Sequence, residues 1–244
     1  MIAIQTINLT KKFDTKTAVN SLNLSINEGE LFALLGVNGA GKTTTIKMLS
    51  CLAAPTSGDA VLLGDSIISN PYAVKEKINV SPQETAVAPN LTVKENLELI
   101  AEMYGSDKKS AKLKAAEMLS TFSLTEVSKD KSKTLSGGMQ RRLSIAMSLI
   151  SNPKILFLDE PTLGLDVLAR RELWAEIKKL KGKITIILTT HYMEEAEALS
   201  DRIAIMSSGE LKAIGTAAEL ISRTDARTFE DAFVALATES EARK

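Results

Sequence analysis

The sequence predicts an α/β fold with a parallel sheet at its core, an antiparallel β part near the N-terminus and an inserted α-helical subdomain. Short apolar runs alternate with helical periodicity beyond residue 135, as expected for parallel strands joined by helical crossovers. Residues 2–26 instead carry apolar side chains near period two, which is typical of half-buried strands. Residues 84–134 carry helix signals and many lysines.

The composition is that of an ordinary globular protein. Of the 244 residues, 44% are apolar and 25% charged, and 30 basic residues balance 30 acidic ones, so no nucleic-acid partner is expected. No apolar stretch approaches the roughly 18–20 residues that span a bilayer. The start of the chain alternates and then turns basic, unlike a signal peptide. The single cysteine, Cys51, leaves no internal disulfide and is expected to be a small buried hydrophobe.

The N-terminal elements are assigned from periodicity. Residues 31–35 form a continuous apolar run, expected of a strand buried on both faces. A helix is predicted at 43–51 and another strand at 59–64. The apolar positions expected to alternate in the first strands are Ile2, Ile4, Ile7, Leu22, Leu24 and Ile26.

The inserted subdomain is predicted to begin with a capped helix. Thr92 and Glu95 form a capping box that opens a helix to about Tyr104, and Gly105 ends it. A second helix is expected at 108–122, with its lysines as a solvated face.

The second half alternates strands and helices. A helix follows LSGGMQ and stops at Asn152 and Pro153. Further strands are expected at 155–158 and 184–190, then a hairpin, and helices near 216–223 and 228–237. The helix predicted at 166–181 is expected to bury Val167, Trp174, Ile177 and Leu180.

Residues 36–43, GVNGAGKT, match the phosphate-loop pattern G-x-x-x-x-G-K-[ST] between a strand and a helix. Its backbone N–H groups are expected to cradle the phosphates of ATP. Lys42 supplies positive charge to the β- and γ-phosphates, and the Thr43 hydroxyl is a ligand for Mg²⁺. A chance glycine-rich turn is the alternative, and the strand–helix context opposes it.

Two carboxylates end the next buried strand, ILFLDE. In open α/β sheets ligands bind at the carboxyl ends of strands. Asp159 is therefore expected on the metal side and Glu160 near the γ-phosphate, where a carboxylate orients the attacking water. Taken alone, an Asp-Glu pair also fits a solvated strand end.

Three further residues are ambiguous from the sequence alone. His191, the single histidine, ends the strand at 184–190, where it fits either a structural role or contact with the γ-phosphate. Gln83 fits an ordinary surface position. Phe13 fits either the core or stacking on adenine.

The order of these motifs resembles the nucleotide-binding subunit of an ATP-binding cassette (ABC) transporter, from about Ile2 to Gly215. The matching segments are the phosphate loop at 36–43, Gln83, the signature LSGGMQ at 135–140, ILFLDE at 155–160, LGLD at 163–166 and His191. The resemblance implies a single domain with a P-loop NTPase core. It implies a RecA-like core from 1–83 and 153–215, a helical subdomain at 84–152 and a short helical tail at 216–244.

The resemblance also implies a role for each motif residue. Glu160, His191, Lys42 and Gln83 are implied to be catalytic, with His191 as the γ-phosphate switch. Thr43, Gln83 and Asp159 are implied to hold Mg²⁺. The implied nucleotide-binding residues are Phe13, Gly36, Asn38, Gly39, Ala40, Gly41, Lys42, Thr43 and Thr44.

The signature is a second phosphate-binding helix start. Its Ser136 hydroxyl and the N–H groups of Gly137 and Gly138 suit a γ-phosphate. The resemblance places Ser136, Gly137, Gly138, Gln140 and Asp166 across a head-to-tail dimer interface, where they complete the site of the facing subunit. Considered alone, the hexapeptide also fits a plain Ser-capped helix.

The tail after His191 is similar to that of subunits serving exporters with type-two permeases. This implies an ATPase homodimer that drives a separate permease, contacted near Gln83 and 84–104. The chain would lie in the cytoplasm on the inner face of the cell membrane. The alternatives are a soluble ABC ATPase of a non-transport assembly system and a regulatory module that does not turn over. The intact Glu160, His191, Gly137 and Gly138 oppose the last of these.

Overall fold

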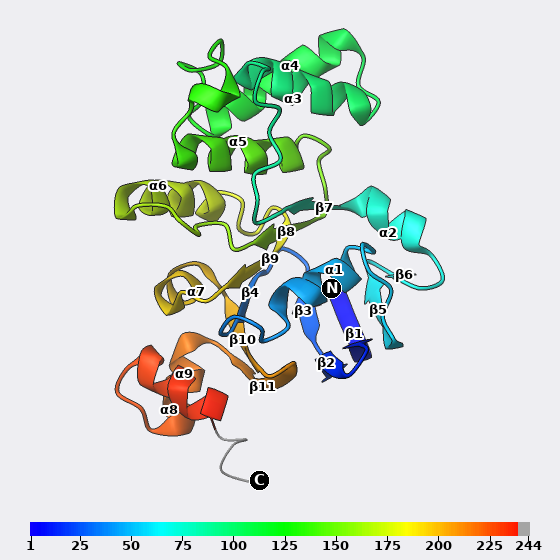
Figure 1. Cartoon of the computed structure of the whole chain (residues 1–244), viewed down its shortest axis with the longest axis vertical. Helices are drawn as coiled ribbons and strands as arrows, with labels where there is room; N and C mark the ends of the chain where they lie inside the picture. The colour runs from blue at the N-terminus through cyan, green and yellow to red at the C-terminus, as the bar shows by residue number, and fades with distance from the viewer. Residues whose placement is uncertain (239–244) are drawn as a thin grey trace.

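A six-stranded, mainly parallel sheet lies at the centre of the fold (Figure 1). The computed structural model describes residues 1–238. Within them, this sheet has the order β11 (Glu210–Gly215), β10 (Arg202–Ser207), β4 (Leu31–Leu35), β9 (Thr185–Thr190), β8 (Ile155–Asp159) and β7 (Ile78–Ser81). All neighbours from β10 to β7 pair parallel, and β11 pairs antiparallel with β10. The carboxyl ends of β4, β8 and β9 therefore meet at one edge of the sheet.

The predicted antiparallel part is a second sheet of five strands. Its order is β2 (Lys16–Leu22), β1 (Ile2–Phe13), β5 (Ser57–Leu62) and β6 (Asp65–Ser66), with β3 (Ser25–Asn27) also paired to β1. The strand expected at 59–64 is β5 and begins two residues earlier. The predicted α/β class with an antiparallel N-terminal sheet is confirmed.

The expected alternation along β1 is only partly right. Ile4 is buried, but Ile2 and Ile7 are 50% and 48% exposed. The pairing of β1 with β5 changes register between Ile7 and Thr10, and Asn8 has a left-handed φ of 48°. That irregularity begins after Ile7, because β1 pairs regularly with β5 from Ile4 to Ile7. Ile7 lies three residues from Ile4, so regular alternation already places the two side chains on opposite faces. Ile2 is the first residue of β1, and the pairing of β1 with β3 changes register between Ile2 and Ile4.

Helix α1 (Lys42–Leu49) follows the phosphate loop and packs beside the antiparallel sheet (Figure 1). It ends before the predicted boundary because Cys51 adopts a left-handed φ of 56°, which α-helix cannot continue. Cys51 is half-buried, and burial raises the pKa of its thiol. Helix α2 (Pro71–Lys77) and edge strand β7 after it are elements that the sequence patterns did not predict.

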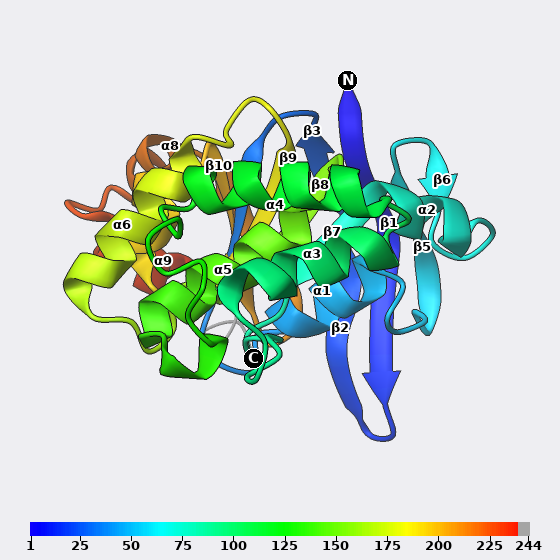
Figure 2. The same ribbon diagram turned by 90° about the horizontal axis from the view of Figure 1, so that it is seen from above.

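The predicted helical segment contains helices α3 (Val93–Met103), α4 (Lys108–Thr121) and α5 (Gly137–Leu149), with a short 3₁₀ turn at Ser132–Thr134. Figure 2 shows α3 and α4 side by side above α5. The Thr92–Glu95 capping box is present, with both reciprocal hydrogen bonds formed. Helix α5 is thus the layer between the outer helices and the parallel sheet (Figure 1).

The second half adds α6 (Val167–Lys178), α7 (Met193–Leu199), α8 (Ala217–Thr224) and α9 (Phe229–Thr238). Ile177 is buried as expected, and Trp174 and Leu180 are partly buried against the core. The expected burial of Val167 is wrong: it is 63% exposed, because it is the first helical residue after the Asp166 cap. Of the predicted tail, residues 239–244 lie outside the described residues.

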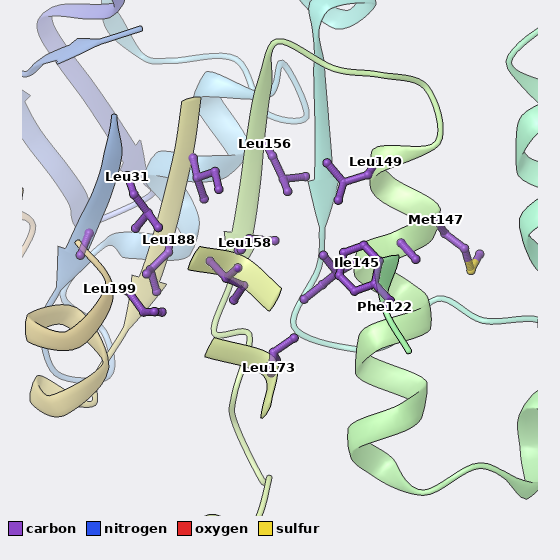
Figure 3. Packing of buried hydrophobic residues seen from close by; sticks show 14 of the residues in the cluster. Leu31, Phe122, Ile145, Met147, Leu149, Leu156, Leu158, Leu173, Leu188 and Leu199 are labelled. Atoms are coloured by element: carbon purple, nitrogen blue, oxygen red, sulfur yellow. The ribbon is translucent and has the colours of Figure 1, made fainter. Parts of the chain in front are cut away.

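Two hydrophobic cores cover the two faces of the parallel sheet. Figure 3 shows one of these cores. In it, the sheet residues Leu158 and Leu188 belong to the same cluster as the helix residues Ile145 and Leu173. Because α5 shares this core with β8, its position is tied to the strand that carries Asp159. No helix within residues 1–238 has the length and apolar character to span a membrane.

Candidate nucleotide-binding site

A cavity of about 580 Å³ opens at the carboxyl ends of β4, β8 and β9. It combines the phosphate loop with side chains from several distant segments of the chain. Its lining residues are Phe13, Lys16, Ala18, Asn38, Gly39, Ala40, Gly41, Lys42, Thr43, Thr44, Gln83, Glu160, Leu163 and His191. The fold therefore brings together most of the residues predicted to contact nucleotide from the same chain.

The phosphate loop holds its shape through two glycines that have no substitute. Gly41 caps α1 with a φ of 101°, and a Cβ there would lie 2.5 Å from the Ala18 carbonyl oxygen. At Gly36, a Cβ would lie 2.4 Å from the Met206 carbonyl oxygen. Lys42 is 5% exposed, and its Nζ donates to the carbonyls of Gly36 at 2.8 Å and Val37 at 3.3 Å. The loop thus holds its own cation at the start of α1, where the helix N-terminus also favours an anion.

Thr43 and Asp159 meet at the base of the cavity. The Thr43 hydroxyl donates to Asp159 Oδ1 at 3.1 Å, and the Thr189 hydroxyl donates to the same oxygen at 2.5 Å. Asp159 is buried at the end of β8. A hydroxyl and a carboxylate side by side are the hard oxygen donors that Mg²⁺ takes, and Mg²⁺ usually fills its other positions with water and phosphate. This donor pair therefore fits the predicted metal.

The Glu160 carboxylate lies between the Lys42 ammonium and the His191 imidazole. Its Oε1 is 3.5 Å from Lys42 Nζ, and its Oε2 is 3.3 Å from His191 Nδ1. The residue has a left-handed φ of 46°, and its N–H donates to the Thr189 carbonyl and hydroxyl. Such a conformation costs about 1 kcal/mol or more in a non-glycine residue, and strain of this kind concentrates at functional sites. The strained turn directs the carboxylate toward the phosphate loop.

His191 and Gln83 both reach the cavity from outside the phosphate loop. His191 follows β9 directly, as its position in the sequence predicted. Gln83 is exposed and lies two residues beyond β7, a strand missed by the sequence patterns. His191 and Gln83 therefore line the same cavity as Glu160.

Phe13 ends β1 and is 51% exposed at the rim of the cavity, so it is not a core residue. Lys11 Nζ lies 5.0 Å from the centre of its ring. Lys16, Ala18 and Leu163 also line the cavity and were not predicted. No motif marks them, because they reach the site only through the β1–β2 hairpin and the turn after Glu160.

The signature residues lie outside this cavity. Ser136 caps α5, where its Oγ accepts from Met139 N at 3.2 Å, and both Ser136 and Gly137 are exposed. Asp166 caps α6 by accepting from the N–H groups of Leu168 and Ala169, and it too is exposed. The Gln140 amide donates to the carbonyls of Ser132 and Leu135 in its own chain. Of the five residues, Gln140 is thus engaged internally, whereas Ser136, Gly137 and Asp166 face outward.

Residues 19–163 match the family described as ABC transporter. The chain belongs to the ABC transporter family. It is 45% identical over 221 residues to the linearmycin resistance ATP-binding protein LnrL of Bacillus subtilis, covering 90% of this chain and 71% of LnrL. It is 44% identical over 209 residues to the doxorubicin resistance ATP-binding protein DrrA of Mycobacterium tuberculosis, covering 84% of this chain and 62% of DrrA.

Solved structures agree with this family. An ATP-binding subunit of an ABC transporter superimposes with a TM-score of 0.84 at 27% identity, covering 96% of this chain and 99% of that one. A dimeric ATP-binding cassette in a post-hydrolysis state, bound to ADP and phosphate, gives a TM-score of 0.78 at 28% identity, covering 87% and 98%. The chain is therefore an ATP-binding subunit of the ABC class, a family of ATP-hydrolysing transporter subunits.

Proposed function

We propose that this chain hydrolyses Mg-ATP as one half of a head-to-tail homodimer and thereby drives a separate membrane permease, in the direction of export. The single observation that supports hydrolysis best is the meeting of Glu160 with Lys42 and His191 over the phosphate loop. A carboxylate there can orient and polarise the attacking water, while Lys42 offsets charge on the phosphates.

The residues predicted to act on the chain's own nucleotide have positions that suit their proposed roles. Asn38, Gly39, Ala40 and Thr44 line the cavity with Lys42, Gly36 lies beneath it at the end of β4, and Phe13 at the rim suits stacking on adenine. Thr43, Asp159 and Gln83 are the proposed Mg²⁺ side, which supplies charge neutralisation on the phosphates when bound. His191, next to Glu160, suits a sensor of the γ-phosphate.

The outward-facing signature supports the dimer. A Cβ added at Gly137 would meet nothing within 4 Å of this chain, so nothing in the chain itself requires glycine there. A helix N-terminus favours an anion, and this one is exposed and lies outside the cavity that would hold the phosphates of the chain's own ATP. We infer that Ser136, Gly137 and Gly138 contact the γ-phosphate of the facing subunit's ATP and that Asp166 lies at the same seam.

The proposed division of the chain is a core of 1–83 and 153–215, a helical subdomain of 84–152 and a tail from 216. The permease contact is proposed near Gln83 and 84–104. Three large apolar side chains of α3 and its cap are exposed there, with Met103 73% exposed and Leu99 and Tyr104 less so. A cleft of about 140 Å³ beside them has Pro82, Ile100 and Tyr104 among its lining residues. Export is proposed because LnrL and DrrA are drug-resistance proteins.

Co-purification from native membranes tests this function. The tagged chain should bring down an integral membrane protein and hydrolyse ATP, and Lys42→Ala should remove most nucleotide binding and all but residual turnover. Met103→Glu should weaken capture of the membrane protein, whereas Leu113→Glu, on α4 and 66% exposed but not part of the cleft, should not. A native protein that captures only soluble partners, and whose ATPase a soluble scaffold stimulates, would contradict the transport function.

A further inference from the structure

Arg141, on the second turn of α5, is a buried cation that no motif singled out. It is 4% exposed, and its guanidinium reaches from the signature helix into the base of the nucleotide site. Burial lowers the pKa of Arg141 to about 10, with Asp159 and Glu195 opposing the shift, so the group stays charged at neutral pH. A buried charge is costly to retain unless it forms good hydrogen bonds.

The hydrogen bonds of Arg141 surround two functional residues. Its Nε donates to the Pro161 carbonyl at 2.9 Å, and its Nη2 donates to the Asp159 carbonyl at 3.0 Å. These two carbonyls belong to the residues immediately before and after Glu160. One rigid, planar group therefore holds both ends of the strained turn that carries the carboxylate.

The remaining nitrogen reaches the segment that carries Gln83. Nη1 donates to the Pro82 carbonyl and, at 3.4 Å, to the Gln83 carbonyl. Among the described residues, Arg141 thus connects three separate segments: the helix that begins at Ser136, the turn at Glu160 and the backbone of Gln83. Each of these segments faces a different component of the proposed machine, namely the partner subunit, the attacking water and the permease.

We propose that Arg141 is a positioning residue that fixes Glu160 relative to Gln83 and transmits movement of α5 to the water-orienting carboxylate. This proposal rests on the proposed function of Glu160. When α5 shifts, the guanidinium carries the carbonyls of Asp159 and Pro161 with it, so the carboxylate between them moves as well. A lysine would keep the charge, but a single ammonium lacks the planar fork that holds these carbonyls in fixed relation.

The test compares Arg141→Met and Arg141→Lys with Leu143→Ala, a substitution of a buried core residue on the same helix whose side chain forms no hydrogen bond. Mg-ATP affinity, kcat, KM and melting temperature are measured for each protein, with wild type and Glu160→Gln alongside. Arg141→Met should bind ATP within about threefold of wild type but lose roughly 100-fold in kcat, the scale expected when a reacting group is misplaced by about 1 Å. Arg141→Lys should recover part of that loss, and Leu143→Ala should melt earlier yet keep kcat per folded molecule.

Three results would overturn the proposal: unchanged kcat in Arg141→Met, a loss no larger than the unfolded fraction explains, or an equal loss of ATP affinity. A role in folding alone predicts that Leu143→Ala and Arg141→Met behave alike once they are matched for stability. Failure of the proposed function is distinguishable, because it would appear as wild-type protein without ATPase activity or as an active Glu160→Gln.

Discussion

The helices α1 and α5 both begin at glycine-rich segments, but the surroundings of their N-termini differ. At the start of α1, Gly41 and Lys42 are packed into a cavity with Glu160 and His191. At the start of α5, Ser136 and Gly137 are exposed, and no side chain of the cavity lies beside them. The N-terminus of α1 is thus surrounded by proposed catalytic side chains of the same chain, whereas the N-terminus of α5 has none beside it. In the proposed dimer, one copy of this chain therefore contributes one half to each of two sites.

The largest expected effect comes from the cavity at the phosphate loop. Glu160→Gln should lower turnover by about two to four decades, because a general base contributes on that scale, while ATP binding is kept. Phosphate release and nucleotide binding are measured in parallel, and gel filtration with ATP should show a stable dimer. Glu126→Gln, exposed and outside the cavity, is the control. Unchanged turnover in Glu160→Gln would remove this residue from the base role.

A substitution at the exposed start of α5 should also lower turnover, but without changing the monomer's own nucleotide cavity. Ser136→Arg should leave ATP binding by the monomer intact, because Ser136 does not line the cavity, and should abolish turnover by blocking the facing subunit. Loss of the helix cap adds a stability cost of about 1 kcal/mol, visible in chemical denaturation. Normal hydrolysis by this variant would refute the assignment of Ser136 to the partner's site.

Two adjacent glycines sharpen the comparison further. A Cβ at Gly137 meets nothing within 4 Å, whereas one at Gly138 lies 3.0 Å from the Ala169 Cβ on α6. Gly137→Ala should therefore keep or slightly raise the free energy of unfolding and still lower turnover about tenfold, equivalent to roughly 1.4 kcal/mol of transition-state stabilisation. Gly138→Ala should lower both. If Gly137→Ala is fully active, no partner approaches that position closely.

The smallest expected effect concerns Glu195, a buried acid four residues after His191. Burial raises the pKa of Glu195, and the polar groups of Thr190, Thr162 and Trp174 and the charge of Arg170 offset part of the shift. The folded state therefore holds this proton more tightly than the unfolded state, and stability falls as pH rises from the unfolded pKa through the raised one. Glu195→Gln removes this titration and keeps an acceptor for the Trp174 indole, which donates at 3.1 Å.

Denaturant unfolding of Glu195→Gln and wild type across pH 4 to 8 tests that expectation. The difference in stability between variant and wild type should move in favour of the variant as pH increases. A constant difference at all pH values would show that Glu195 does not titrate in this interval. The nucleotide site should be unaffected in the comparison, because Glu195 does not line the cavity.

Local signals in the sequence predicted most of the fold. The phosphate loop, the buried strands and the Thr92–Glu95 capping box each depend on neighbouring residues, and all three appear as expected. Strand β7, residues Ile78–Ser81, is short and alternates too little to be recognised, and its pairing with β8 creates it. Val167 was misplaced because the helical period alone does not show where a first turn leaves the core.

The site was predictable where a motif specifies chemistry and unpredictable where tertiary structure supplies the contact. Asp159, Glu160 and His191 lie at or directly after strand ends as predicted; Glu160 contacts Lys42 and His191, and Asp159 contacts Thr43. Arg141, in contrast, is marked by no motif. Its proposed role depends on two carbonyl-bearing segments, residues 82–83 and 159–161, that lie apart from α5 in sequence and meet it only in the folded chain.

Complementation between two inactive variants shows whether each signature acts on the ATP of the facing subunit. Ser136→Arg keeps an intact phosphate loop and Glu160, and Glu160→Gln keeps an intact signature. If each signature serves the facing subunit, mixing the two and allowing exchange creates heterodimers with one whole site, so turnover should rise well above that of either variant alone. If each signature serves its own chain, every site in the mixture stays defective, and a mixture no more active than its components would contradict the account.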